Sequence, residues 1–209
     1  MIQRRRHREV WEIIADSWRN LRNKPEIIVS QLANEVEVES VLDIGCGSGR
    51  NILPFLERGI KCVGLDYAKS MIREAKKFLM GIGLKPLLVV GDAVDLPFKK
   101  KSFDLVLCIR TLHHVETRRL RIKTLREMKA TGRKMLLSVW KKWQRRFIPK
   151  LVVGFFDSDV YVPWRYHGKT LMRFYHLYTK NELEADLRMA GIRKFKLFDD
   201  GKNFWVETL

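Results

Sequence analysis

The stretch VLDIGCGSG at residues 41–49 decides the fold of this chain. Its apolar first half predicts a strand, and three glycines at alternate positions predict a tight turn directly after it. Glycine tolerates positive φ angles and lets a ligand approach the backbone closely. The spacing is GxGxG, with Asp43 two residues before the first glycine, whereas dinucleotide-binding enzymes carry GxGxxG. The stretch therefore predicts a ligand site at the carboxyl end of a parallel strand.

Short apolar runs alternate with amphipathic segments on both sides of this turn, which is typical of βα units around a parallel sheet. Strands are expected at 39–44, 60–65, 86–91, 104–109, 134–139, 193–198 and 203–208. Helices are expected at 8–22, 25–34, 49–58, 69–80, 116–130 and 179–190. The turn signal DDGK at 199–202 joins the last two strands into an antiparallel hairpin. The pattern predicts an α/β fold with a seven-stranded, doubly wound, Rossmann-like sheet that ends in this C-terminal hairpin.

Length and composition predict one globular domain over residues 1–209, with N-terminal helices in residues 1–35. Residues 141–178 do not follow the βα rhythm, and we expect an aromatic and basic insertion over the carboxyl ends of the strands, near the active site. No apolar run approaches the roughly 20 residues that span a bilayer, and no secretory signal is expected. The three cysteines are scattered, which argues against a disulfide scaffold or a zinc site. We expect a cytoplasmic protein that neither associates with a membrane nor binds a metal.

Positive charge is concentrated in residues 118–150. The chain has 41 Lys+Arg against 24 Asp+Glu, and this segment holds thirteen of the basic residues with a single acid, Glu127. Pairing within the segment cannot neutralise it, so a solvated helix face is the weaker interpretation. Trp140, Trp143 and Phe147 interleave with the cations, as on surfaces that stack bases beside phosphates. The segment therefore predicts a nucleic-acid partner.

Two further acids follow the next two predicted strands, Asp66 after the second and Asp92 after the third. Together with Asp43 and the glycine turn, they resemble the cofactor motifs of the S-adenosylmethionine-dependent methyltransferases. The resemblance implies that Asp43 binds the cofactor ammonium group, Asp66 the ribose hydroxyls and Asp92 the adenine amino group. The cofactor residues that it implies are Asp43, Gly45, Gly47, Gly49, Asp66, Tyr67, Asp92, Ala93 and Ile109.

The fourth predicted strand ends in CIRTLHHV, residues 108–115, where many amino-group methyltransferases carry an Asn/Asp-Pro-Pro-aromatic motif. This difference disfavours methylation of an exocyclic amine. Cys46 and Cys108 lie in apolar surroundings and are expected to be inert core thiols rather than the nucleophile of a cytosine-C5 enzyme.

The two histidines belong to a wider pattern. Trp140 ends the fifth predicted strand, and the segments WRNLRNKP (18–25), DVYVPW (159–164) and RFYHLY (173–178) lie outside the sheet pattern. Together they closely resemble the tRNA wobble-uridine carboxymethyl methyltransferases, which esterify 5-carboxymethyluridine at anticodon position 34. The resemblance runs nearly end to end. One departure is ATGRK at 130–134, where the family commonly has Pro-Gly-Gly.

This resemblance implies S-adenosylmethionine as the cofactor and the anticodon arm of tRNA as the substrate. The acceptor carboxylate is ionised at neutral pH, so the reaction needs no strong general base. The candidates for holding it are Arg22, His114 and Arg173, with Trp140 as a stacking surface or pocket wall. His113 is the alternative to His114, and a plain surface charge is the alternative for both arginines.

The resemblance also implies a partner, a small zinc-ribbon activator protein that binds by strand addition. The strand at 87–90 should lie at a sheet edge and carries no blocking charge, which favours pairing with another chain. The alternative is an edge that the chain's own helices cover. Two other functions stay open: a methyltransferase for a small molecule such as a quinone precursor, and a non-enzymatic RNA-binding protein on the same fold.

Overall fold

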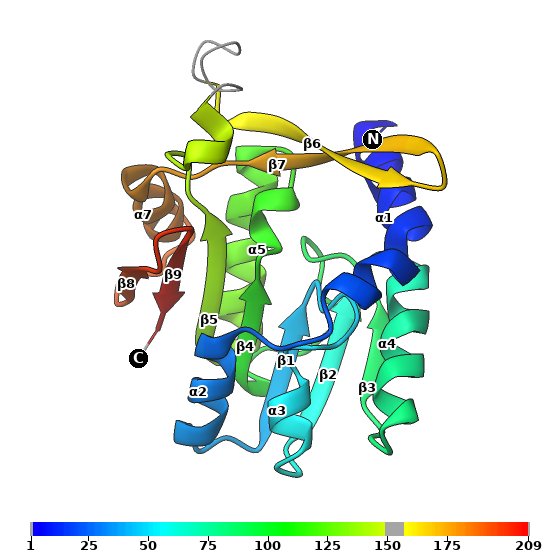
Figure 1. Cartoon of the computed structure of the whole chain (residues 1–209). Helices are drawn as coiled ribbons and strands as arrows, with labels where there is room; N and C mark the ends of the chain where they lie inside the picture. Colours follow the sequence, from blue (N-terminus) through cyan, green and yellow to red (C-terminus); the bar gives the residue numbers. More distant parts are fainter. Residues whose placement is uncertain (1, 149–156, 209) are drawn as a thin grey trace.

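A seven-stranded sheet forms the centre of the computed structural model, which describes residues 2–148 and 157–208 (Figure 1). Its strands follow the order β3-β2-β1-β4-β5-β9-β8. Their bounds are β1 (Ser40–Ile44), β2 (Lys61–Asp66), β3 (Leu87–Val90), β4 (Phe103–Ile109), β5 (Gly132–Trp140), β8 (Lys196–Asp199) and β9 (Asn203–Glu207). β1 to β5 are parallel, and β9 pairs antiparallel with β5 and β8. The predicted doubly wound sheet and its C-terminal hairpin are confirmed.

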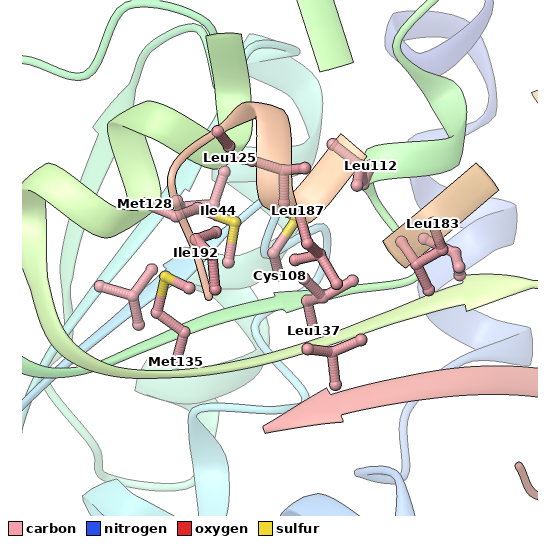
Figure 2. Close-up of a cluster of buried hydrophobic side chains, with 14 of the residues drawn as sticks. Ile44, Cys108, Leu112, Leu125, Met128, Met135, Leu137, Leu183, Leu187 and Ile192 are labelled. Carbon is pink, nitrogen blue, oxygen red and sulfur yellow. The ribbon is translucent and has the colours of Figure 1, made fainter. Parts of the chain in front are cut away.

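Helices cover both faces of the sheet. They are α1 (Ile2–Leu21), α2 (Ile27–Glu35), α3 (Leu53–Leu56), α4 (Lys69–Gly81), α5 (Arg118–Thr131) and α7 (Lys180–Met189), with the short 3₁₀ helices η1 (Leu112–His114) and η2 (Arg145–Phe147). Apolar side chains of α5 and α7 pack on one face against β4 and β5, as Figure 2 shows for Leu125, Leu187, Cys108 and Leu137. α2 and α3 pack on the other face. In the described part of the chain, none of the helices combines the length and apolar character needed to cross a membrane.

The predicted helix at 49–58 is wrong in its extent, because only Leu53–Leu56 is helical. Pro54 lacks a backbone N–H and fits only the first helical turn, so the helix cannot begin much earlier. Gly59 then adopts a positive φ of 74°, which ends the helix after one turn. The residues between Gly45 and this helix form a series of turns instead.

The described part of the predicted insertion contains an antiparallel hairpin of β6 (Asp159–Tyr166) and β7 (Lys169–His176). Figure 1 shows it lying across the carboxyl ends of the parallel strands, at the top of the view. The sequence analysis placed the insertion there but did not assign strands to it. The turn uses His167 and Gly168, both at positive φ, as a two-residue hairpin loop requires. Residues 149–156 of the predicted insertion lie outside the described residues.

Both ends of this hairpin are fastened to helices. At the tip, the Trp164 indole donates to the Ser17 hydroxyl of α1 at 3.1 Å. At the base, the two ring nitrogens of His176 lie 2.6 Å from Asp159 and 2.7 Å from Glu182 of α7. Burial lowers the pKa of His176, but the bonds to the two carboxylates outweigh it and raise the pKa overall. His176 is thus a structural tie, and the hairpin is held as a roof over the strand ends.

Candidate active site

A pocket opens at the carboxyl ends of β1 and β4, the point where the strand order reverses direction. Open α/β sheets bind ligands at this switch point. The empty volume of the pocket is about 1040 Å³, including open solvent at its mouth, which leaves room for a nucleoside-sized ligand. The strand ends, α1 and the hairpin all contribute to its walls, including Trp11, Trp18, Gly47, Asp66, Asp92, Thr111, His113, His114, Trp140 and Tyr175.

The glycine turn forms the floor of the pocket. Gly45, Gly47 and Gly49 all have positive φ, at 69°, 54° and 78°. A Cβ on Gly45 would lie 2.2 Å from the Thr111 side chain, so the turn and the end of β4 are in close contact only because this residue is glycine. The Gly47 N–H donates to Asp66 at 3.0 Å, which fixes the turn against the end of β2.

The adjacent histidines His113 and His114 have opposite hydrogen-bonding patterns. The backbone N–H of Trp140 donates to Nδ1 of His113 at 3.0 Å, so the proton of the neutral His113 ring is on Nε2. Nδ1 of His114 lies 3.0 Å from the carbonyl of Phe174, which can only accept, so Nε2 of the neutral His114 ring keeps its lone pair. Burial lowers the pKa of both rings well below the usual value. The pair therefore offers one donor and one acceptor, and no positive charge, at neutral pH.

Arg173 is buried under the hairpin, with 6% of its surface exposed. Its guanidinium lies over the rings of Trp164 at 4.6 Å and Trp18 at 5.7 Å, and donates to the Tyr175 hydroxyl at 2.8 Å. No acid pairs with it among the residues that the structure describes, and its Nε has no hydrogen-bond partner there. Burial lowers the pKa of Arg173, and the charge of Arg22 lowers it further to a smaller extent. A buried cation without a counter-ion is costly and favours a bound anion.

Trp140 is enclosed on both faces. The Tyr175 ring stacks on it at 4.1 Å with an interplanar angle of 7°, and the Arg146 guanidinium lies 4.1 Å from the ring centre. Two groups at such short distances cannot share one face, so they lie on opposite sides. Trp140 consequently forms a pocket wall, and neither face is free to stack a base.

The basic segment 118–150 is only partly available to a partner. Pairing within the segment does not neutralise it, but acids and backbone carbonyls from other parts of the chain bind some of its cations. Arg118 pairs with Asp186 at 2.7 Å, and Lys129 donates to the carbonyl of Gly191 at 2.8 Å. Further ion pairs are Arg121–Glu182, Arg133–Asp104 and Lys141–Asp199, and Arg126 donates to the carbonyl of Met189. Of the interleaved aromatics, Phe147 is buried and Trp143 is 60% exposed.

Three comparisons with known proteins bear on this pocket. Residues 41–134 match the family described as a methyltransferase domain. A protein of Encephalitozoon cuniculi that is named as a methyltransferase is 37% identical over 168 residues, which cover 77% of this chain and 72% of the relative. The chain belongs to the S-adenosylmethionine-dependent methyltransferases.

A more distant relative of this methyltransferase has a more specific name. The tRNA (carboxymethyluridine(34)-5-O)-methyltransferase of Schizosaccharomyces pombe is 27% identical over 228 residues, covering 95% of this chain and 93% of the relative. Among solved structures, the S-adenosylmethionine-bound amino pentose methyltransferase of Micromonospora echinaspora superposes with a TM-score of 0.65 at 17% identity, covering 93% of this chain and 95% of that one.

The pocket of the methyltransferase fits its cofactor. Asp43 is buried, and neither carboxylate oxygen has a hydrogen-bond partner in the described ranges. Burial raises its pKa to about 8, with a smaller contribution from Asp66. A buried carboxylate beside the glycine turn is the group expected to receive a cofactor ammonium. Asp66 accepts hydrogen bonds from the N–H groups of Gly47 and Ala68 at the pocket wall. Burial raises the pKa of Asp66 to about 6.

Asp92, which is expected to bind the adenine amino group, is paired with an arginine in this structure. Both of its carboxylate oxygens accept from the Arg4 guanidinium of α1 at 2.8 Å. Arg4 also approaches Glu116 at 3.4 Å. Both acids lie on the pocket wall, so the first turns of α1 close this end of the pocket.

Most of the predicted residues meet in this one pocket. Those lining it are Arg22, Gly45, Gly47, Asp66, Tyr67, Asp92, Ala93, Ile109, His114 and Trp140. Asp43, Gly49 and Arg173 do not line it. Cys108 and Cys46 are buried, and burial raises the thiol pKa of both, to about 12 for Cys108, as expected for inert thiols.

The sequence analysis missed Tyr175, which lines the pocket and contacts Trp140, His114 and Arg173. An alternation signal was present, because side chains two residues apart on a strand share one face. Identifying 169–176 as a strand would have placed Tyr175 beside Arg173.

Proposed function

We propose that this methyltransferase forms the methyl ester of 5-carboxymethyluridine at the wobble position of tRNA. The observation that carries the proposal is the buried Arg173, an unpaired cation joined to the pocket through the Tyr175 hydroxyl. The name of the Schizosaccharomyces pombe relative, which spans nearly the whole chain, supports the same substrate. When bound, S-adenosylmethionine would supply an electrophilic methyl group to the carboxylate oxygen and would leave as a neutral thioether, so the chain would need to transfer no proton.

The residues of the chain then have to bind an anion and exclude water. Arg22 and Arg146 are exposed near the pocket, and neither has an acidic partner in the part of the chain that the structure describes. Together with Arg173 they produce a positive potential that favours a carboxylate over a neutral group. The aromatic walls and the hairpin roof limit the access of water.

The histidine pair suits a uracil ring. His113 offers an Nε2–H donor and His114 an Nε2 acceptor, and both line the pocket. A uracil edge presents the complementary set, a carbonyl acceptor and the N3–H donor. His114 is therefore assigned to the base rather than to the carboxylate, because its lone pair would repel an anion.

The experiment that tests this function is methyl transfer from labelled cofactor to tRNA isolated from cells lacking the activity, with the activator protein present. We expect one labelled nucleoside with the mass of the methyl ester, and loss of the label on mild base treatment. Label that resists base, or a labelled nucleoside at another position, would overturn the proposal.

A small-molecule acceptor is the alternative substrate. Phosphate contacts release counter-ions, so binding of tRNA should weaken steeply as salt is raised, whereas binding of a small quinone precursor should not. Binding of the cofactor alone serves as the salt-insensitive control. Cofactor binding together with tRNA binding but no transfer would favour the non-enzymatic alternative.

We also propose that a small zinc-ribbon activator protein pairs with β3. β3 lies at the edge of the sheet, and its Leu87 and Val90 side chains are 68% and 47% exposed. An exposed apolar edge strand favours pairing with a strand of another protein.

Changing Leu87 to lysine is expected to weaken binding of the activator protein at least tenfold, because a charge would be introduced into the apolar contact. Isothermal titration of the two purified proteins measures this affinity. The matched control is Ile27→Lys on α2, at a side chain that is 75% exposed and away from β3. Equal binding by both variants would contradict an interface at β3.

A further inference from the structure

The Tyr175 side chain packs at the pocket wall, with 1% of its surface exposed. Its ring stacks on Trp140 and lies 4.3 Å from the His114 ring centre. Its hydroxyl accepts from Arg173 at 2.8 Å. A tyrosine hydroxyl can also donate one hydrogen bond, and within the described ranges this hydrogen has no acceptor. A buried donor without a partner is unfavourable unless a ligand supplies the acceptor.

The charges that act most strongly on this hydroxyl are positive. Arg173, Arg22, Arg146 and Arg110 each act on it electrostatically, and no acid does so to a comparable extent. Arg110 shares Glu26 with Arg50, at 2.7 and 2.6 Å, but the described residues contain no acid paired with the other three. Burial raises the pKa of Tyr175 to about 12, so the hydroxyl keeps its hydrogen at neutral pH. The acceptor that best matches a retained O–H among three unpaired guanidinium groups is a carboxylate.

We propose that Tyr175 binds the acceptor carboxylate through its hydroxyl hydrogen, while Arg173 holds and polarises the hydroxyl from behind. Arg173 itself does not line the pocket, whereas Tyr175 does. Tyr175 thus carries the effect of the buried cation to the substrate and selects an acid over a neutral analogue. The inference rests on the proposed function, because it requires a carboxylate as the methyl acceptor.

The test compares the wild type with Tyr175→Phe, which keeps the stacked ring and removes only the hydroxyl. The substrates are two anticodon stem-loop RNAs, one with 5-carboxymethyluridine at the wobble position and one with the corresponding amide as a competitor. We expect kcat/KM for the acid RNA to fall about 10- to 100-fold. The preference for binding the acid RNA over the amide RNA should fall by a similar factor, and the affinity for the cofactor should stay unchanged.

The matched control is Tyr166→Phe, in the same hairpin, whose hydroxyl donates to Asp16 at the surface. It should retain the acid preference of the wild type. Normal transfer by Tyr175→Phe would overturn the role of Tyr175. Equal losses of binding affinity for the acid RNA and the amide RNA would also overturn this role, because they would show that Tyr175 is needed only for the structure of the pocket. No transfer by the wild type would instead overturn the proposed function.

Discussion

Replacing Arg173 with methionine is expected to remove most of the methyl transfer while leaving the fold as stable as before, or more stable. The guanidinium donates to Tyr175 and has no acidic partner in the described chain, so its charge is uncompensated without substrate. A charge-assisted hydrogen bond is worth about 1.5–3 kcal/mol, which corresponds to a loss of roughly 10- to 150-fold in kcat/KM. A buried charge replaced by an apolar side chain of similar volume is often neutral or stabilising, by about 1–4 kcal/mol.

Thermal unfolding and single-turnover methyl transfer measure the two effects separately. Arg193→Met is the control, because Arg193 is exposed and does not line the pocket. If Arg173 acts through Tyr175, the double variant with Tyr175→Phe should lose no more activity than Tyr175→Phe alone. Arg173→Met with full activity, or with a Tm well below that of the wild type, would contradict the assigned role.

Replacing Asp43 with asparagine is expected to stabilise the cofactor-free protein at pH 8 and to weaken cofactor binding. The pKa of Asp43 rises from 3.8 to about 8 on folding because the carboxylate is buried. The folded protein therefore keeps this proton in a pH range where the unfolded chain has released it. Its stability falls as the pH rises from about 4 to about 8.

The neutral amide removes this pH-dependent cost but still lacks hydrogen-bond partners. We expect a net gain of about 1–3 kcal/mol at pH 8, or roughly 2–10 °C in Tm, and a much smaller gain at pH 5. Cofactor affinity should fall about 10- to 100-fold, since the ammonium loses its carboxylate.

Asp104→Asn is the matched control, because its expected effect on stability at pH 8 has the opposite sign. Asp104 accepts from the Ser40 hydroxyl at 2.8 Å and from two backbone N–H groups. The bond from the Ser40 hydroxyl lowers the pKa of Asp104, and this effect is larger than the opposing effect of burial. The ionised Asp104 therefore stabilises the fold at neutral pH, and this stabilisation is lost as the pH falls. Asp104→Asn should destabilise the protein at pH 8 and leave cofactor binding unchanged. A pH-independent difference for Asp43→Asn would contradict the account of a buried, unpartnered carboxylate.

The sheet was predictable because its signals are local. The apolar runs and the glycine turn at 41–49 identify the strands and their order in the chain. The acids at the end of β2 and shortly after β3 point to the same edge of the sheet. The His167-Gly168 turn between β6 and β7 was a weaker signal, and Pro163 within β6 argued against a strand. Pro163 is tolerated because this hairpin has only two strands, so both are edges.

Long-range pairing was not predictable from the sequence. Asp186 neutralises Arg118 across 68 residues, and Arg4 reaches Asp92 across 88. A count of charges within the segment 118–150 cannot reveal such partners, because they lie far away in the sequence. The tautomers of His113 and His114 likewise depend on backbone groups of β5 and β7, and those contacts exist only in the folded chain.

The most direct measurement compares two synthetic anticodon stem-loops that differ only at the wobble position, one with 5-carboxymethyluridine and one with uridine. Each is incubated with labelled cofactor, the methyltransferase and the activator protein, and its nucleosides are then identified by mass. The account predicts a base-labile methyl ester on the 5-carboxymethyluridine RNA and no label on the uridine RNA. Label on both RNAs, or on neither while the cofactor is bound, would contradict it.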